Sequence, residues 1–415
     1  MGDLRWATLH TEMMKNRKVD LSPAMACWNE GRLEDAEHQL RQVLDGTPDL
    51  PLALQLLGAV YCRQARYADA LPPLQRACEL QPDNAASLHE LSQVLARLGR
   101  REQALESVDA SLALEPDNPA ALMLRARTLM ELQWPLCALH SIERALALAP
   151  DWAFAWQCRG DVLALLVEAG MKRRAAAIDS YRRAMALGGD ADELAFSLAV
   201  LGEGAPPAVV PATVVRELFD AYAPNFEQHL TQALNYRGHE YIGQMLHRAD
   251  LPLPLAEVWD LGCGTGLCAP LLRPLARHLV GVDLSPRMLQ IAQARGTYDH
   301  LRCGDIVACL QGRHSDIDLL VAADVFVYIG SLEAVFEASK HALRPGAHLA
   351  FSIESNEDAE YTLSSTRRYA HSIGYIERLA SSHGLHLVER VLRVLRENLG
   401  QEVPGWVVLL QRGFS

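Results

Sequence analysis

A turn with three alternating glycines constrains the fold of this chain more than any other feature. The turn runs from Gly262 to Gly266 and follows an apolar run that begins at Val258 and contains Asp260. Glycine permits backbone angles that other residues avoid, and it lets a ligand approach the main chain closely. The free N–H groups at the start of the helix expected after Leu267 would face that ligand. The pattern therefore predicts a nucleotide-type loop at the carboxyl end of a first parallel strand.

Two further apolar runs are followed by acids in the same way. Asp283 closes the run that begins at Leu279, one helix and a short loop after the glycine turn. Asp305 follows a shorter run that begins at His300. A carboxylate at the tip of the second strand can accept both hydroxyls of a ribose, as in dinucleotide-binding folds. Glycines that serve only as turns would not explain why acids recur in this way.

NAD binding is the alternative for this loop, but the NAD motif has two residues between its second and third glycines and this chain has one. Asp260-x-Gly262-x-Gly264-x-Gly266, followed by Asp283 and by Gly304-Asp305, resembles instead the signature of class I methyltransferases that use S-adenosyl-L-methionine (SAM). The resemblance covers the second half of the chain. It implies a Rossmann-like doubly wound sheet of seven strands, the last one antiparallel.

The resemblance also implies roles for individual residues. The glycine loop should cradle the methionine part of SAM, with Asp260 near its amino group. Asp283 should hold the ribose hydroxyls, and Asp305 should face the adenine amine. The cofactor-binding residues implied in this way are Asp260, Gly262, Cys263, Gly264, Gly266, Asp283, Leu284, Asp305 and Ile306.

The first half of the chain repeats at a fixed spacing. Prolines recur at positions 48, 82, 116 and 150, and alanines recur at 36, 70, 104 and 138. This spacing is that of the tetratricopeptide repeat (TPR), whose period is about 34 residues. In such repeats small residues let paired helices pack closely, and a proline ends each pair. A fifth unit from Ala153 fits only if about five residues are inserted within 167–174. The units should stack into an α-solenoid.

The predicted domains are a TPR array of about five repeats over residues 1–200, a linker rich in glycine and proline over 201–212, and a methyltransferase domain over 213–415. The array's groove should dock a protein or peptide partner. Alternatively, the array is a dimerisation element or a rigid spacer, because its architecture alone does not name a partner.

A segment that resembles the lid of small-molecule methyltransferases opens the second domain. Its aromatic residues recur at helical spacing, and Pro224 should break the segment into two pieces. Phe219 and Phe226 are expected in the core, and Tyr222 and His229 at the substrate.

The acceptor site is expected after the fourth strand, where ligands meet the sheet. We expect Asp324 and Tyr328 there, near a segment around residues 366–375 that resembles bacterial methyltransferases with TPR repeats. The roles follow from the chemistry of methyl transfer: His371 is the first choice for a general base and Asp324 the second, and the Tyr328 hydroxyl would orient the acceptor. Arg368 would hold an anionic acceptor. The expected substrate-binding residues are Tyr222, His229, Arg368, Tyr369 and Tyr375.

Composition limits the remaining function classes. The net charge of −12 gives no broad basic surface for nucleic acid. The 9 cysteines form no C-x-x-C pair, so we expect neither a disulfide framework nor a metal site. The chain start lacks the apolar core of a signal peptide, and no apolar run is long enough to span a membrane, which suggests the cytoplasm.

Two function classes fit these patterns. The first is a SAM-dependent methyltransferase that acts on the oxygen or nitrogen of a small-molecule or protein-tethered acceptor, with the TPR array docking a partner or substrate protein. The second is a non-catalytic interaction protein that retains a methyltransferase fold. Intact cofactor motifs favour the enzyme.

Overall fold

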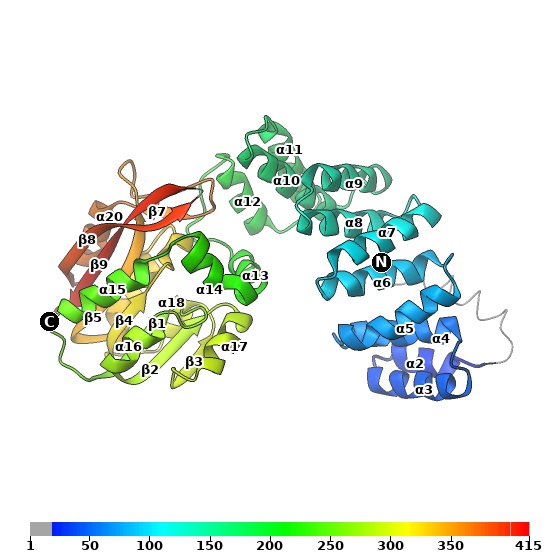
Figure 1. Ribbon diagram of the computed structural model, residues 1–415. Coiled ribbons are helices and arrows are strands. Elements are labelled where there is room, and N and C mark those ends of the chain that lie inside the picture. The colour runs from blue at the N-terminus through cyan, green and yellow to red at the C-terminus, as the bar shows by residue number, and fades with distance from the viewer. Residues whose placement is uncertain (1–18, 399, 415) are drawn as a thin grey trace. The chain divides into compact units, whose positions relative to one another are not determined.

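The computed structural model describes residues 19–398 and 400–414. The chain divides into two compact units, Met1–Gly189 and Asp190–Ser415 (Figure 1). A short amphipathic helix expected within residues 1–16 lies outside the described residues. Within the described part of the chain, no helix is both long and apolar enough to cross a membrane.

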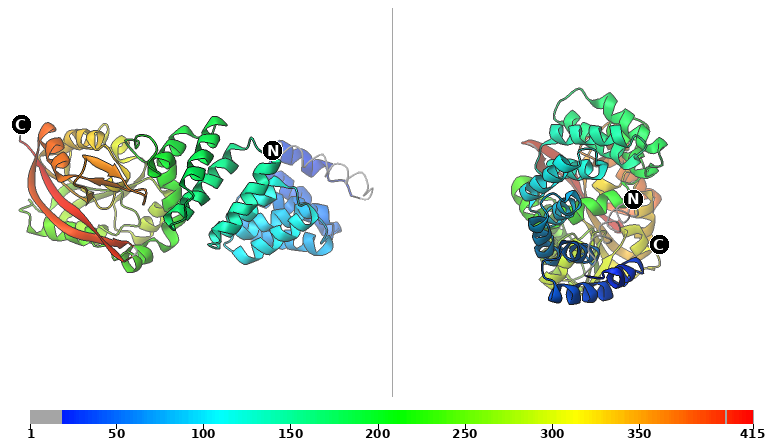
Figure 2. Two further views of the ribbon diagram at one scale, coloured as in Figure 1. Left: turned by 90° about the horizontal axis from the view of Figure 1, so that it is seen from above. Right: turned by 90° about the vertical axis from the view of Figure 1, so that its right-hand side faces the viewer.

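The first unit is a row of helices joined in pairs (Figure 2). The recurring prolines lie in the turns between pairs, as predicted. The helices are α2 (Ser22–Asn29), α3 (Leu33–Gly46), α4 (Pro51–Arg63), α5 (Tyr67–Leu80), α6 (Ala85–Arg97), α7 (Arg101–Leu114), α8 (Pro119–Glu131), α9 (Pro135–Leu148), α10 (Ala153–Glu168) and α11 (Arg174–Ala186).

Small residues lie where paired helices touch. The four alanines that recur at positions 36, 70, 104 and 138 are completely buried. A Cβ added at Gly58 would lie 2.4 Å from Leu74 Cγ, and one at Gly160 would lie 2.5 Å from Tyr181 Cε1. Leu74 and Tyr181 therefore fill the space that the glycines leave. The expected insertion in the fifth unit is also present, because α11 begins at Arg174 and not at position 169, where the period would place it.

The second unit is built on a mixed sheet. Seven strands form the main sheet in the order β3-β2-β1-β4-β5-β9-β8. The first five are parallel, and β9 is antiparallel to both of its neighbours. This confirms the predicted doubly wound sheet. All strands of the unit are β1 (Leu255–Leu261), β2 (Ala276–Asp283), β3 (His300–Cys303), β4 (Ile317–Ala322), β5 (Leu343–Ser355), β6 (Tyr361–Leu363), β7 (Tyr369–His371), β8 (Leu385–Asn398) and β9 (Gln401–Arg412).

Helices cover both faces of the sheet, so consecutive strand residues are buried on opposite sides (Figure 1). Trp259 and Leu320 belong to the core on one face, and Val258 and Leu319 to the core on the other. The helices of the first core are α18 (Ile306–Leu310), α19 (Glu333–Ala342) and α20 (Ile373–Ser382). Those of the second are α15 (Gly238–Arg248), α16 (Ala269–Leu272) and α17 (Pro286–Arg295).

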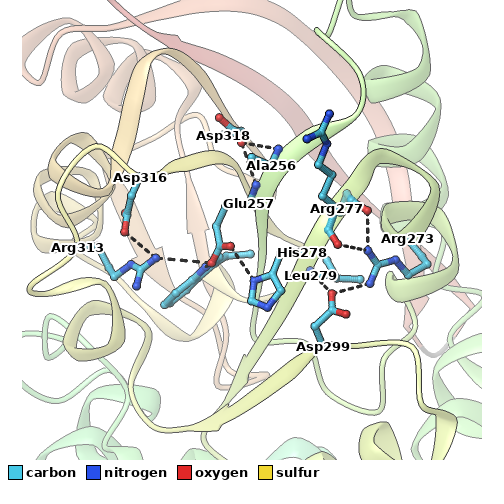
Figure 3. A network of polar contacts seen from close by, with 12 residues as sticks. Ala256, Glu257, Arg273, Arg277, His278, Leu279, Asp299, Arg313, Asp316 and Asp318 are labelled. Atoms are coloured by element: carbon cyan, nitrogen blue, oxygen red, sulfur yellow. Dashed lines mark hydrogen bonds and ion pairs between the residues drawn. The ribbon is translucent and has the colours of Figure 1, made fainter.

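The two ends of the strands differ in their contacts. At the amino ends, ion pairs and hydrogen bonds tie neighbouring strands together, as Figure 3 shows: Glu257 pairs with His278, and the Asp318 carboxylate accepts from the Ala256 and Glu257 N–H groups. At the carboxyl end of β5, a short hairpin of β6 and β7 extends the sheet. These two short strands carry no sequence pattern that predicts them.

The predicted linker is part of the second unit. The helix α12 (Ala191–Val200) belongs there too, with its Phe196 buried in a cluster with Val210. Backbone hydrogen bonds join residues 208–210 to the segment after β4: the Val210 N–H donates to Tyr328 O, and the Gly330 N–H donates to Ala208 O. The contacts thus divide the chain before α12, ahead of the boundary expected at 201–212.

Candidate functional site

A cavity of about 490 Å³ opens at the carboxyl ends of the parallel strands. One part of its wall comes from the glycine turn and the loops after β2 and β3. These residues are Gly262, Cys263, Gly264, Leu267, Cys268, Asp283, Leu284, Asp305 and Ile306. The other part comes from α12, the segment that follows it, the lid and the loop after β4. Its members are Asp192, Ala195, residues 207–212, Val215, Phe219, Phe226, Leu230, Tyr236, His239, Ala323, Asp324, Val325, Tyr328 and Ile329.

The glycine turn has the backbone that its sequence predicts. Gly262, Gly264 and Gly266 all have positive φ angles, which favour glycine. A Cβ at Gly262 would lie 2.4 Å from Val325 Cγ2, and one at Gly264 would lie 3.5 Å from Phe226 Cε1. The turn therefore leaves bare backbone against the cavity. Gly266 itself does not line the cavity.

Asp283 and Asp305 both reach the cavity, as expected. The Asp283 carboxylate accepts hydrogen bonds from the Gly264 and Ser285 N–H groups, each 2.8 Å long. Burial raises the pKa of Asp283, and these hydrogen bonds work against the rise. Asp305 is exposed, and one of its oxygens caps α18 by accepting from the Ala308 N–H at 2.9 Å. Both carboxylates keep capacity for further hydrogen bonds.

Asp260 does not line the cavity, which corrects its expected place beside the cofactor's amino group. It is 1% exposed and accepts a 2.6 Å hydrogen bond from the Tyr298 hydroxyl. Burial raises the pKa of Asp260 to about 7. Tyr298 also packs under the turn, because a Cβ at Gly266 would lie 3.1 Å from its ring. Asp260 and Tyr298 thus form a buried pair that supports the turn from beneath.

The lid lies across the cavity and is not one continuous helix. It consists of α13 (Ala212–Tyr222), a short turn around Pro224, α14 (Phe226–Gln228) and a π-helical turn (His229–Ala233). The interruption changes which side chains share a face, so a constant helical spacing does not describe the segment.

The lid reverses the expected roles of its aromatic residues. Phe219 and Phe226 line the cavity, and Phe219 also packs against the buried cluster that contains Phe196, so the expected core position holds in part for Phe219 and not for Phe226. Tyr222 and His229 pack against each other at 5.0 Å, outside the cavity wall, and do not face a substrate. Both corrections follow from the break in the helix.

Polar contacts fasten the lid to the loops that carry the cofactor motifs. The Asp220 carboxylate accepts from the hydroxyl of Ser285, which follows the second strand. Glu227 accepts from the Thr265 hydroxyl, within the glycine turn, and from Arg295 on α17. The pKa of Glu227 is lowered, because these two hydrogen bonds together outweigh the opposing effect of burial. The position of the lid is therefore coupled to the turn that faces the cavity.

Asp324 lines the cavity in an uncommon backbone conformation. Its φ is +61°, and its N–H donates to Ser352 Oγ at 3.0 Å. Its carboxylate forms a two-pronged ion pair with Arg368, which also donates to the Tyr328 hydroxyl at 3.1 Å. Arg368 is buried and does not line the cavity. This corrects the expectation that Arg368 binds an anionic acceptor.

The charge network continues away from the cavity. Arg368 Nε donates to Glu354 at 2.7 Å, and Arg396 pairs with the same carboxylate at 3.0 Å. Glu354, Arg368 and Arg396 are all buried. Two acids and two arginines therefore neutralise one another behind the loop after β4, and they fix the position of Asp324.

His371 is completely buried and does not line the cavity. Its Nε2 lies 2.9 Å from Ile329 O and 3.0 Å from Gly330 O, so this nitrogen must carry a proton and donate. Burial lowers the pKa of His371 to about 4. The imidazole braces the segment after β4, and the expectation that it acts as a general base is wrong in this geometry.

The two tyrosines of the same segment also depart from the expected role. The Tyr369 hydroxyl donates to Pro207 O, which attaches β7 to the cavity-wall segment. The Tyr375 hydroxyl accepts from the Leu332 N–H at 3.0 Å. Both tyrosines are buried, and neither lines the cavity. They hold the wall in place and do not face a substrate.

Tyr236 and His239 lie at the cavity wall, where no motif predicts them. Their rings stack at 5.5 Å. The Tyr236 hydroxyl is buried and makes no hydrogen bond of ordinary geometry with the described residues, although Ser352 is close enough to oppose the rise in its pKa. The only sequence signal is a Tyr and a His on either side of Gly238.

The geometry fits a nucleoside cofactor. Bare backbone at the turn and two carboxylates at strand tips meet in one cavity, whose volume lies in the range of small-molecule sites. A doubly wound sheet with these features defines a cofactor-dependent domain whose ligand binds at the carboxyl ends of the strands. The Tyr236 hydroxyl and His239 Nδ1 are two buried polar atoms of wall residues that have no ordinary hydrogen-bond partner among the described residues.

Comparison with known families agrees with this class. Residues 259–351 match the family described as a methyltransferase domain, and residues 63–128 match a tetratricopeptide repeat family. The chain therefore carries TPR repeats followed by a methyltransferase domain. The match to a methyltransferase domain agrees with the fold that the glycine turn and the strand-tip acids predict.

Individual relatives cover parts of the chain. A ubiquinone biosynthesis O-methyltransferase of Xylella fastidiosa (strain 9a5c) is 26% identical over 144 residues, which are 34% of this chain and 56% of the relative. Human methyltransferase-like protein 27 is 43% identical over 86 residues, 20% of this chain and 34% of the relative. Each of these matches thus spans less than two thirds of the relative's own length. A solved SAM-dependent methyltransferase from Clostridium acetobutylicum ATCC 824 is 18% identical, with coverage of 46% of this chain and 99% of that one and a TM-score of 0.36.

Proposed function

We propose that this chain is a SAM-dependent methyltransferase that transfers a methyl group to an oxygen or nitrogen of an apolar acceptor. One observation carries the proposal. The glycine turn, Asp283 and Asp305 share a single cavity with a largely apolar wall built by the lid and residues 207–212. A cofactor and an acceptor can therefore meet in one cavity, which is the first requirement for group transfer.

The cofactor part of the wall supports the following binding roles. Asp283 would accept the ribose hydroxyls, Asp305 would accept the adenine amine, and the backbone at Gly264 would approach the methionine part. Phe226 lies over Gly264 and would exclude water from that point. When bound, SAM supplies an electrophilic methyl group. Cys263, Leu284 and Ile306 also belong to this part of the wall.

The acceptor part of the wall favours a neutral, apolar molecule. Val209, Phe219 and Ile329 lie there, and the negative charge of Asp324 is already balanced by Arg368. An anionic acceptor would find no unpaired cation among the described residues that line the cavity. The name of the Xylella relative, a ubiquinone biosynthesis O-methyltransferase, is consistent with a hydroxyl on an apolar molecule.

Methyl-labelled SAM and a cell extract test this function. The full chain should transfer label to the apolar small-molecule fraction, and it should transfer little to the protein fraction. An Asp283→Ala variant should lose the transfer. Label that appears mainly in protein would reject a free small-molecule acceptor, and no transfer to any fraction would reject the enzyme.

The TPR array provides a second candidate binding surface. A cleft of about 570 Å³ within the first unit is lined by apolar and aromatic residues together with Arg97 and Arg127. Arg97 stacks over Tyr67, and neither arginine has a carboxylate partner among the described residues. Among the described residues of the lining, Asp161 is the one acid, and it accepts a hydrogen bond from the hydroxyl of Tyr181.

We propose that this cleft docks an acidic peptide segment of a partner or substrate protein. Unpaired guanidinium groups beside apolar surface suit a carboxylate-bearing segment that also buries apolar side chains. Arg97→Glu with Arg127→Glu should abolish binding of acidic peptides, and Arg144→Glu, outside the cleft, should not.

A non-catalytic interaction protein is the alternative function. The unpaired arginines of the array favour an interaction protein as much as they favour an enzyme that docks a substrate protein. Calorimetric titration with SAM separates the two: saturable binding supports the enzyme, and no binding at millimolar SAM supports the interaction protein.

A further inference from the structure

The cavity holds several ionisable side chains, and most are already engaged. Both oxygens of Asp283 accept backbone N–H groups, and Asp305 lies on the cofactor part of the wall and caps a helix. Asp324 and the Tyr328 hydroxyl both contact Arg368. These groups are therefore poorly placed to take a proton from an acceptor.

His239 differs from all of them. Its ring stacks on Tyr236, and neither of its ring nitrogens has a hydrogen-bond partner among the described residues. Its Nδ1 is buried without a partner, so Nε2 is the nitrogen that a molecule in the cavity can reach. Burial also lowers the pKa of His239, although Glu240 opposes this effect. The imidazole is therefore neutral at pH 7 and can accept a proton.

The position of His239 suits this role. It lies in the first turn of α15, where the helix dipole further disfavours a positive charge. Its neighbour Tyr236 lines the same cavity as Cys268, which follows the glycine turn, and Asp324, which follows β4. The stacked pair therefore lies between the glycine turn and the loop after β4, which are the cofactor and acceptor parts of the wall.

The remaining ionisable groups on the wall are weaker candidates. Burial raises the pKa of the Cys263 and Cys268 thiols, so both stay protonated. Asp192 has no side-chain partner among the described residues, but it is exposed at the start of α12, so water solvates its carboxylate. The imidazole of His239 lines the cavity, is held by the stack on Tyr236 and has no competing hydrogen-bond partner among the described residues, which favours it as the base.

We propose that His239 is the general base of methyl transfer and that Tyr236 is the positioning residue that holds its ring. The inference rests on the proposed function. His239 Nε2 takes the proton from the acceptor's O–H or N–H group. The electron pair left on that oxygen or nitrogen forms the bond to the methyl carbon, while the bond between methyl and sulfur breaks and its electron pair stays on sulfur.

Transfer of labelled methyl to the apolar extract fraction tests this assignment in the full chain. His239→Ala should lower the transfer rate about 100-fold or more while SAM affinity, measured by calorimetry, stays unchanged. Added imidazole should restore part of the rate, because it can occupy the space that the side chain leaves. His247→Ala, further along the same helix and exposed, is the matched control and should transfer normally without imidazole.

The possible results distinguish the role of His239 from the proposed function of the chain. A His239→Ala variant that transfers methyl at the wild-type rate overturns the role of His239 and leaves the proposed function intact. A slow variant that imidazole does not rescue shows a structural role and also overturns the proposal. No transfer by the wild-type chain rejects the proposed function and this inference together. Tyr236→Phe should keep the ring stack and most of the rate, whereas Tyr236→Ala should slow transfer.

Discussion

The carboxylate of Asp283 accepts a 2.8 Å hydrogen bond from the backbone N–H of Gly264. The tip of the second strand thereby fixes the glycine turn at the end of the first. The other oxygen of Asp283 holds the Ser285 N–H, and the Ser285 hydroxyl donates to Asp220 on the lid. One side chain therefore connects the turn, the second strand and the lid around the same cavity.

Asp283→Asn tests that arrangement. The amide keeps the size of the side chain, but it has one acceptor oxygen and no charge. Hydrogen bonds to charged groups are worth about 1.5–3 kcal/mol, so we expect SAM to bind about 10- to 100-fold more weakly. Titration calorimetry measures the effect. Asp250→Asn, in an exposed position before β1, is the control. Equal affinities for the two variants would contradict the ribose role of Asp283.

Gly262→Ala should damage the turn in two ways. The residue has a φ of +67°, and its new Cβ would lie 2.4 Å from Val325 Cγ2. We expect a loss of about 1–3 kcal/mol in unfolding free energy from strain, together with weaker SAM binding as Val325 moves into the cavity. Chemical unfolding and calorimetry report the two effects.

A second pair of variants separates the effect of backbone strain from the effect of the steric clash with Val325. Gly296 has a φ of +66°, and a Cβ there would meet no atom within 4 Å, so Gly296→Ala should show the strain without the loss of SAM affinity. Adding Val325→Ala to Gly262→Ala should recover part of the SAM affinity. If the double variant binds no better than Gly262→Ala, steric displacement of Val325 is not the cause.

Much of the fold can be predicted from the sequence, because it depends on periodic patterns. The repeat period places the alanines at the helix contacts, and the spacing of glycines and acids places Gly262, Asp283 and Asp305 around one cavity. These features depend on local backbone geometry and on where parallel strands end, so they can be read along the chain.

The residues around the acceptor site cannot be predicted from the sequence in the same way. His371 and Arg368 resemble pocket residues in the sequence, but their partners are Gly330 and Asp324, which lie far away along the chain. Pro224 predicts the break in the lid, but it does not predict which lid residues then face the cavity. The proline-rich stretch before the lid has the composition of a linker, yet its backbone pairs with the loop after β4. Long-range pairing of this kind leaves no periodic signal.

Arg368→Met should destabilise the second unit strongly. The change removes the cation between Asp324 and Glu354, so the partly buried Asp324 carboxylate loses its partner and Glu354 keeps only Arg396. Breaking a buried ion pair by removing one member typically costs about 3–5 kcal/mol. Unfolding by denaturant measures the loss. Adding Asp324→Asn to the variant should recover part of it, and a double variant as unstable as Arg368→Met alone would contradict a charge-based cause.

The buried pair beneath the turn predicts a dependence of stability on pH. The pKa of Asp260 is raised from 3.8 to about 7 in the folded chain, so folding favours its protonated form. Its contribution to stability is therefore complete below pH 4, and it falls as the pH rises towards 7. Each pKa unit corresponds to about 1.4 kcal/mol, so the whole change is on the order of 4 kcal/mol.

Hydrogen exchange of the β1 amides at several pH values measures this contribution within the second unit. Asp260→Asn cannot ionise, so the stability it gains over the wild-type chain should grow between pH 4 and pH 7. His371 provides a contrast, because burial lowers its pKa from 6.5 to about 4 and folding favours its neutral form. The stability of His371→Asn relative to the wild-type chain should therefore increase as the pH falls through the same window. Two variants that follow the same trend with pH would show that at least one of these buried groups titrates outside its expected range.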